Sequence, residues 1–161
     1  MSYSTKSALH NANLKNILND IIFKVNNRVF TSGAALAIGD TAKTAVANGA
    51  FTVMRDGVIS SISAETTGTP FTATVHDIAD GYGAIYLFYL DENNAMKIVK
   101  GDSVLAGTGA VCPETPEGGL KVGEVKIVTS GALFDATTTA LDAGTVTDTY
   151  TNVSDVLDSI I

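Results

Sequence analysis

The sequence is short of the residues on which several protein classes depend. Cysteine occurs once, as Cys112, so no disulfide can form within the chain and the fold must rest on buried side chains. Tryptophan is absent, and the two histidines, His10 and His76, have no partner at the spacing of a metal site. Charged residues make up 17% of the chain, where about a quarter is usual. This composition predicts a neutral, hydroxyl-rich surface, which suits strands that pack against other protein surfaces.

Long apolar runs and catalytic motifs are also missing. No stretch approaches the roughly 18 apolar residues of a membrane span, and the first residues lack the apolar run of a signal peptide. We therefore expect a soluble chain that is made in a cytoplasm and has no membrane partner. There is no Walker loop, no GxGxxG after a strand, no HExxH and no GxSxG. A nucleophilic Cys112 would need a base near it in space, for which the chain offers only the two histidines. His76-Asp77 is expected to be a polar surface pair, so we predict no enzyme and no cofactor or metal.

Charge is distributed unevenly along the chain. The formal net charge of −7 argues against bulk nucleic-acid binding, which depends on neutralising phosphates. Residues 1–30 carry the bases Lys6, Lys15, Lys24 and Arg28 against one acid, whereas residues 131–161 carry aspartates and no base. This gradient would help docking onto an acidic partner or between subunits, or both ends are simply solvated. The aspartates Asp135, Asp142 and Asp148 lack the spacing of a calcium loop.

The most apolar segment is Gly83–Gly101, which predicts a hairpin at the centre of a β core. Ile85–Leu90 is an unbroken apolar and aromatic run, Asp91–Asn94 has turn chemistry, and Met96–Val99 is apolar again. A strand that is apolar throughout needs cover on both faces. Either the N-terminal helix or another chain would provide the second cover, so the strand predicts a homo-oligomer with a subunit interface at Ile85, Leu87 and Tyr89.

The N-terminal segment predicts a helix over residues 4–21. Leu14, Ile17, Leu18 and Ile21 fall on one face at helical spacing, and Ser4 or Thr5 can cap the first turn. Such a helix is marginal alone and must pack on something. It packs on its own domain, or it is an arm that reaches a neighbouring subunit or a larger assembly.

Short strands and turns fill the rest of the chain. Asp56-Gly57 between alternating runs predicts a hairpin over Phe51–Ser63, and Asn26-Asn27 predicts a tight turn between residues 21–25 and 28–30. Further strands are expected at Ala35–Ile38, Phe71–Val75, Leu120–Thr129 and Thr145–Tyr150, with residues 66–70 as a linker and residues 102–119 as a Pro/Gly-rich surface loop. In Leu120–Thr129, Gly123 marks a bulge, and Leu120, Val122 and Val128 are expected to face one way.

Together these elements predict a mainly β protein. We expect a single β-sandwich or barrel-like domain of about seven to nine short strands over residues 23–161. Residues 1–22 would form an N-terminal helical arm.

Several phrases resemble a loose group of small tailed-phage virion proteins. A helix is followed by IIFKVNNRVFTS, YLFYLDENNAMKIVKG, a Pro-rich loop and LKVGEVKIVTSGALFDATTTALDAG. In that group a Gly-x-Val/Ile strand precedes an "F…GTTALDAAG" phrase. Residues standing in its places are Phe134, Thr137, Thr138, Thr139, Ala140, Leu141, Asp142, Ala143 and Gly144, with Ala136 where the group commonly has Gly.

The resemblance implies a structural role without catalytic residues. It implies a capsid decoration (cement) protein on the virion surface, commonly oligomeric and here expected to be a trimer, that binds the major capsid protein. Under this hypothesis the arm is the capsid anchor, through Lys6, Leu9, Leu14, Lys15, Ile17 and Leu18. Alternatives are a tail, collar or fibre accessory protein, and a carbohydrate-binding module that uses the aromatic residues of Tyr82–Tyr89 on a host-surface glycan.

Overall fold

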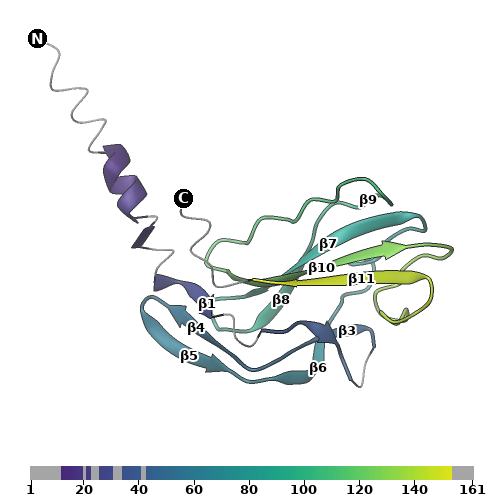
Figure 1. Ribbon diagram of the computed structural model, residues 1–161, viewed down its shortest axis with the longest axis horizontal. Helices are drawn as coiled ribbons and strands as arrows, with labels where there is room; N and C mark the ends of the chain where they lie inside the picture. The colour runs from purple at the N-terminus through teal and green to yellow at the C-terminus, as the bar shows by residue number, and fades with distance from the viewer. Residues whose placement is uncertain (1–11, 20, 23–25, 31–33, 41–42, 154–161) are drawn as a thin grey trace, which may run out of the picture.

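The computed structural model describes residues 12–19, 21–22, 26–30, 34–40 and 43–153 (Figure 1). Eleven strands occur among these residues, and they form three antiparallel sheets. Residues 12–19 and 21–22 are helical. The mainly β, sandwich-like fold with an N-terminal helix is therefore confirmed. The strands outnumber the predicted seven to nine because short pairings also form in segments rich in Thr, Ala and Gly.

The largest sheet has the strand order β11-β10-β7-β8, and β9 pairs with the start of β7. Its strands are β7 (Tyr82–Leu90), β8 (Met96–Lys100), β9 (Val104–Leu105), β10 (Leu120–Thr129) and β11 (Val146–Asn152). Two three-stranded sheets lie below it in Figure 1 and form the second layer. They are β1 (Arg28–Phe30), β4 (Phe51–Arg55) and β5 (Val58–Ile62), and β2 (Ala37–Ile38), β3 (Ala45–Asn48) and β6 (Glu65–Pro70).

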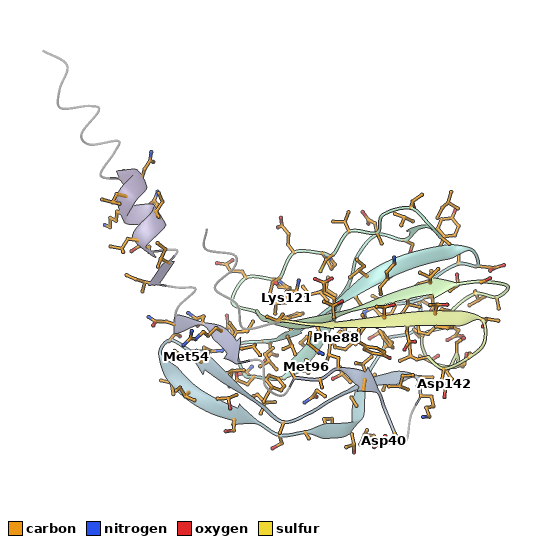
Figure 2. The ribbon with its side chains drawn as sticks, viewed as in Figure 1. Asp40, Met54, Phe88, Met96, Lys121 and Asp142 are labelled. Atoms are coloured by element: carbon orange, nitrogen blue, oxygen red, sulfur yellow. The ribbon has the colours of Figure 1, made fainter. Side chains whose placement is uncertain are left out.

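The core lies between these layers. Alternate residues of β7 face the smaller sheets, and Ala84, Tyr86, Phe88 and Leu90 are all fully buried; Figure 2 shows Phe88 between the layers. The ring of Phe71 meets those of Tyr86, Phe88 and Phe134 edge-on, at centroid distances of 5.0, 6.2 and 5.7 Å. Edge-to-face packing of this kind adds to the burial of the rings.

The two strongest hairpin predictions are confirmed. Asp56 and Gly57 both have positive φ, at 50° and 78°, and join β4 to β5 with Arg55 opposite Val58. A two-residue turn of this type requires positive φ at both positions, which is why the Asp-Gly pair predicts it so well. The central hairpin also forms, because β7 and β8 pair antiparallel across the turn at residues 91–95.

The predicted bulge in β10 is present, and it changes which residues face the core. The register with β7 shifts between Lys121 and Gly123. Leu120 and Val122 face the core before the shift, and Val125 and Ile127 face it afterwards. The expectation that Val128 shares their face was wrong, since an extra residue in a strand reverses the alternation beyond it.

Two local predictions were wrong for reasons that lie elsewhere in the chain. Residues 21–22 are helical, and β1 pairs with β4, so Asn26-Asn27 does not join two paired strands. Instead, Asn26 O accepts a hydrogen bond from Gly57 N, and Asn27 Oδ1 accepts one from Asp56 N, at 3.1 and 3.0 Å. Both residues thus hold the β4–β5 turn in place through hydrogen bonds.

The second error concerns the segment before the core hairpin. The expected linker at residues 66–70 belongs to strand β6, which pairs with β3. The expected strand at Phe71–Val75 does not form, because this segment turns, with Thr74 at a φ of 62°. Phe71 is buried as an anchor of this turn and not as a member of a sheet.

Candidate functional site

The described residues contain no group of three or more His, Cys, Asp or Glu side chains that could hold a metal ion. His76 was expected on the surface beside Asp77, and this was wrong: its side chain is 5% exposed. Its Nδ1 accepts a hydrogen bond of 2.7 Å from Thr72 N, and its carbonyl oxygen accepts one from the hydroxyl of Tyr86. Burial, and then the nearby charge of Lys100, lower the pKa of His76, while Asp77 opposes them. His76 therefore serves as a neutral acceptor that holds the 72–76 turn.

Cys112 has the surroundings of a structural thiol. Its Sγ donates to Pro113 O at 3.4 Å and lies 3.8 Å from Lys121 Nζ. Burial raises the pKa of the thiol, and a hydrogen bond to Glu124 raises it further, so the neutral form is favoured. A thiol needs a lowered pKa and a neighbouring base to act as a nucleophile.

The helical residues 12–19 expose an apolar stripe. Leu14, Ile17 and Leu18 are 57%, 55% and 53% exposed, and none of them belongs to the core cluster. Lys15 is exposed beside them. The helix stands clear of the β layers in Figures 1 and 2. Of the other anchor residues predicted from the sequence, Lys6 and Leu9 lie outside the described residues. The described part of the arm therefore presents apolar side chains that the β domain does not cover.

The predicted interface residues lie on the outer face of β7, where the chain supplies its own cover. Leu87 is fully buried, and Ile85 and Tyr89 are partly buried. A Cβ placed on Gly101 would lie 2.6 Å from Val111 O, and one on Gly119 would lie 2.8 Å from the ring of Tyr89. The Pro/Gly-rich segment 102–119 thus returns across this face of the sheet. The apolar strand therefore needs no second chain to cover it. The strand no longer supports the prediction of a homo-oligomer, and oligomerisation stays a prediction.

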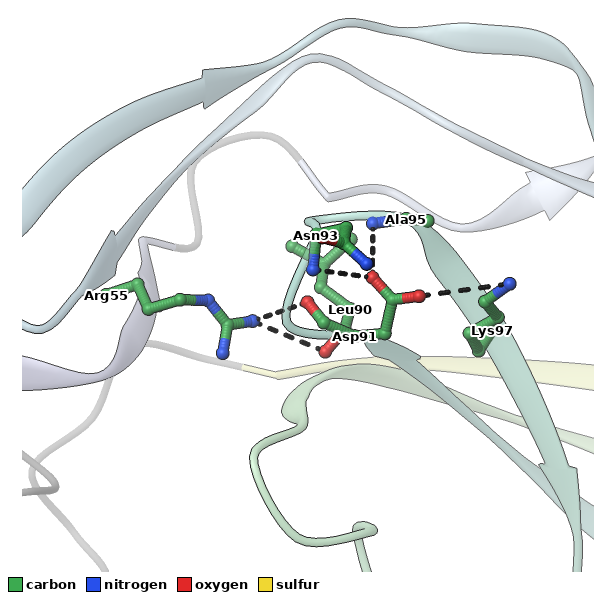
Figure 3. Close-up of polar contacts among 6 residues, drawn as sticks. All are labelled: Arg55, Leu90, Asp91, Asn93, Ala95 and Lys97. Atoms are coloured by element: carbon green, nitrogen blue, oxygen red, sulfur yellow. Dashed lines mark hydrogen bonds and ion pairs between the residues drawn. The ribbon is translucent and has the colours of Figure 1, made fainter.

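An open cleft of about 290 Å³ lies at the turn between β7 and β8. It is lined by Tyr89, Asp91, Glu92, Asn93, Pro116, Glu117 and Gly119. The Asp91 carboxylate accepts hydrogen bonds from the backbone N–H groups of Ala95 and Asn93, both at 2.9 Å, and pairs with Lys97 at 3.8 Å (Figure 3). The Ala95 bond is the main cause that lowers the pKa of Asp91. The carboxylate thereby fixes the turn that forms one wall of the cleft.

Arg55 ties this turn to the other layer. Its Nη1 donates to Gly118 O at 2.6 Å. Its Nη2 donates to Asp91 O at 2.8 Å and to Leu90 O at 3.5 Å (Figure 3). Its Nε donates to Asn94 Oδ1 at 3.4 Å. The sequence did not identify the partners of Arg55, because they lie 35 to 63 positions away. The position of Arg55 directly before the Asp-Gly turn is the one local signal, since it places the side chain at the end of a hairpin.

The aromatic residues of β7 are divided between the core and the cleft. Tyr86 and Phe88 are fully buried, and Tyr82 packs against the core. Of the aromatic residues of Tyr82–Tyr89, only Tyr89 lines the cleft, beside carboxylate and amide groups. On β7, Tyr89 is thus the one aromatic ring that could stack on a sugar in the cleft.

Comparison of the chain with protein-family models, with curated proteins and with solved structures finds no match. Among the described residues, no helix is long and apolar enough to cross a membrane. The function must therefore be argued from the chain's own surfaces.

Proposed function

We propose that this chain is a tailed-phage virion structural protein, a capsid decoration protein that docks on the shell of the major capsid protein. The observation that carries the docking role is the uncovered apolar stripe of the arm, at Leu14, Ile17 and Leu18. The phage assignment rests on the resemblance of the phrases around residues 134–144 to small virion proteins. The self-covered β domain supports a body that stays folded while the arm engages a partner.

The chemistry of the arm defines the surface it fits. Residues at i, i+3 and i+4 insert as anchors when an amphipathic helix lies in a groove. Lys15 borders the stripe, and residues 1–30 carry four bases against one acid. The partner surface is therefore an apolar groove with an acidic rim. On a symmetric shell, many such shallow contacts give firm decoration through avidity, even where each one is weak.

Binding to assembled shells tests the proposal. The protein is mixed with undecorated shells of the cognate major capsid protein, and co-sedimentation is measured over a concentration series. Ile17→Asp should reduce binding at least tenfold, because it places a charge in the stripe. Val111→Asp is the matched control, since Val111 is also apolar and is 76% exposed in loop 102–119. Equal binding by both variants and the unaltered protein would remove the arm as the anchor.

Electron cryomicroscopy of the virion tests the location. Density for this chain on the head lattice is the expected result. Density at the tail, collar or fibre would replace the decoration role with an accessory role. It would also decide whether the copies form the trimer that the resemblance implies.

A carbohydrate-binding role is the second candidate, and the cleft beside Tyr89 favours it. An aromatic ring with a few polar groups placed beside it can bind and orient a small ligand, and a sugar offers an apolar face and hydroxyl groups to such a site. A glycan array screened with the unaltered protein and with Tyr89→Ala is the test. Retention that depends on Tyr89 would support this role in place of, or beside, decoration.

A further inference from the structure

Strand β11 forms an open edge of the five-stranded sheet. Among the strands of the described residues, it pairs with β10 alone. Ser130 N donates to Thr145 O at 2.9 Å, and Val153 N donates to Val122 O at 3.1 Å, so the odd-numbered residues of β11 are bonded to β10. The backbone N–H and C=O groups of Asp148, Tyr150 and Asn152 therefore point away from the sheet. No hydrogen bond from the described residues reaches them.

The other edge strands carry features that discourage pairing with another chain. Among these features are lysines, prolines and short length. β8 carries Lys97 and Lys100, β6 contains Gly68 and Pro70, and β1 and β2 are three and two residues long. β5 has none of these residues but is only five residues long. β11 has seven residues with neither lysine nor proline, and its outward-facing threonines are exposed.

We propose that β11 is a self-pairing edge, which binds β11 of a second copy of this chain in antiparallel register about a two-fold axis at Thr149. Only even-numbered residues offer groups at the open edge, so they must pair with each other. The register centred on Thr149 is the one that pairs all four of them within β11, joining Asp148 to Tyr150 of the second copy and Val146 to Asn152. Val146 N already donates to Ala143 O, which leaves about six bonds between the strands. Thr149 then lies opposite Thr149 of the second copy in a non-hydrogen-bonded pair.

The side chains of β11 that face the core also favour this register. A charge that points inward from an edge strand normally opposes pairing, because a second strand would bury it. Asp148 is such a residue. Its carboxylate lies near the hydroxyl of Tyr150 on the same strand and, after burial, helps to raise the pKa of that phenol. Even so, its Oδ2 and the Tyr150 hydroxyl are both buried without a hydrogen bond of good geometry among the described residues. In the proposed register each Asp148 lies directly opposite Tyr150 of the other copy, so each carboxylate faces a phenol donor.

The pairing does not depend on the proposed capsid role. It joins two single copies, or it joins neighbouring trimers if the chain is trimeric. A seven-residue edge buries less than the roughly 1,000 Å² expected of a stable interface, so the contact is weak between free copies. Its detection therefore needs covalent trapping or high protein concentration.

Disulfide trapping tests the register. Thr149→Cys and Thr147→Cys are each made in full-length protein carrying Cys112→Ser, and disulfide-linked dimer is measured under mild oxidation. A cross-strand non-hydrogen-bonded pair has the short Cα separation that a disulfide needs. Thr149→Cys should give dimer rapidly. Thr147→Cys should not, because residue 147 lies opposite residue 151. Equal rates for the two variants, or no dimer from Thr149→Cys, would overturn the proposal.

Charge substitution tests the contact without oxidation. Thr149→Lys brings two ammonium groups together at the axis and should weaken self-association, measured by sedimentation equilibrium, at least tenfold. Mixing Thr149→Lys with Thr149→Glu should restore it as a heterodimer. Ile59→Lys is the matched control on β5, the shorter edge strand that also lacks lysine and proline, where Ile59 is 63% exposed. Loss of association in Ile59→Lys but not in Thr149→Lys would place the contact on β5, and a strict monomer at all concentrations would exclude any such contact.

Discussion

Replacing Arg55 by methionine should loosen the two layers at one end of the sandwich. Methionine keeps the aliphatic stem and removes the guanidinium group, so packing is retained while four hydrogen bonds are lost. Two of these bonds are short, to Gly118 O at 2.6 Å and to Asp91 O at 2.8 Å. The other two, at 3.4 and 3.5 Å, contribute little.

The magnitude follows from the two short bonds. A hydrogen bond to a charged group contributes about 1.5–3 kcal/mol, which gives about 3–6 kcal/mol for the pair. Arg55 is partly exposed, so water can reach part of the vacated site and the loss falls at the lower end, about 3 kcal/mol. For a chain of this length, that lowers the melting temperature by roughly 6–12 °C. Arg55→Lys should fall between the two, because a single ammonium group cannot reproduce the planar fork.

Urea denaturation of the purified protein measures the effect, with the transition midpoint and the m-value recorded separately. Lys97→Ala is the control, since Lys97 pairs with Asp91 at 3.8 Å and is half exposed, and such surface pairs contribute below about 1 kcal/mol. Amide hydrogen exchange should accelerate at Gly118 and Gly119 in Arg55→Met and not in the control. A loss under 1 kcal/mol, or one equal to that of Lys97→Ala, would refute the view that Arg55 holds the layers together.

Three further predictions concern other contacts. Burial lowers the pKa of His76, so the protein should be most stable above a pH of about 6.5 and should lose stability as the pH falls below that value. His76→Gln keeps an acceptor for Thr72 N and should flatten this dependence, measured by thermal melts at a series of pH values. Gly68→Ala should cost at least about 3 kcal/mol in urea denaturation, because Gly68 has a φ of +87° and a Cβ there would lie 2.7 Å from the backbone of β3. Leu87→Ala should cost about 2–5 kcal/mol without changing the mass measured by light scattering, and a changed mass would show that another chain shares the cover of this residue.

Local chemistry made several elements predictable. Asp56-Gly57 predicts its own turn because both residues accept positive φ. The run Ile85–Leu90 predicts a buried strand, and Gly123 predicts the bulge in β10. The candidate arm was also visible, since Leu14, Ile17 and Leu18 share one helical face and the structure leaves that face uncovered.

Contacts between distant segments could not be predicted in the same way. β6 forms in a Thr- and Gly-containing segment because β3 provides a partner, and His76 is buried because Phe71 and Tyr86 surround it. The cleft beside Tyr89 needs residues 91–93 and 116–119 to meet, and the bonds of Arg55 join the ends of both layers. None of these features is marked in the sequence by a hydrophobic period or a motif.

The sequence by itself determined the β class, the two main hairpins, the helical arm and the absence of a disulfide. These depend on backbone preferences and on the alternation of apolar residues, which act over a few positions. Only the tertiary structure decided that loop 102–119 covers the outer face of β7, and that β11 is left as a long edge without lysine or proline. Both outcomes depend on which strands become neighbours. The packing of the whole chain decides which strands become neighbours. A strand that the sequence predicts to need cover from another chain can therefore be covered by a loop of its own chain.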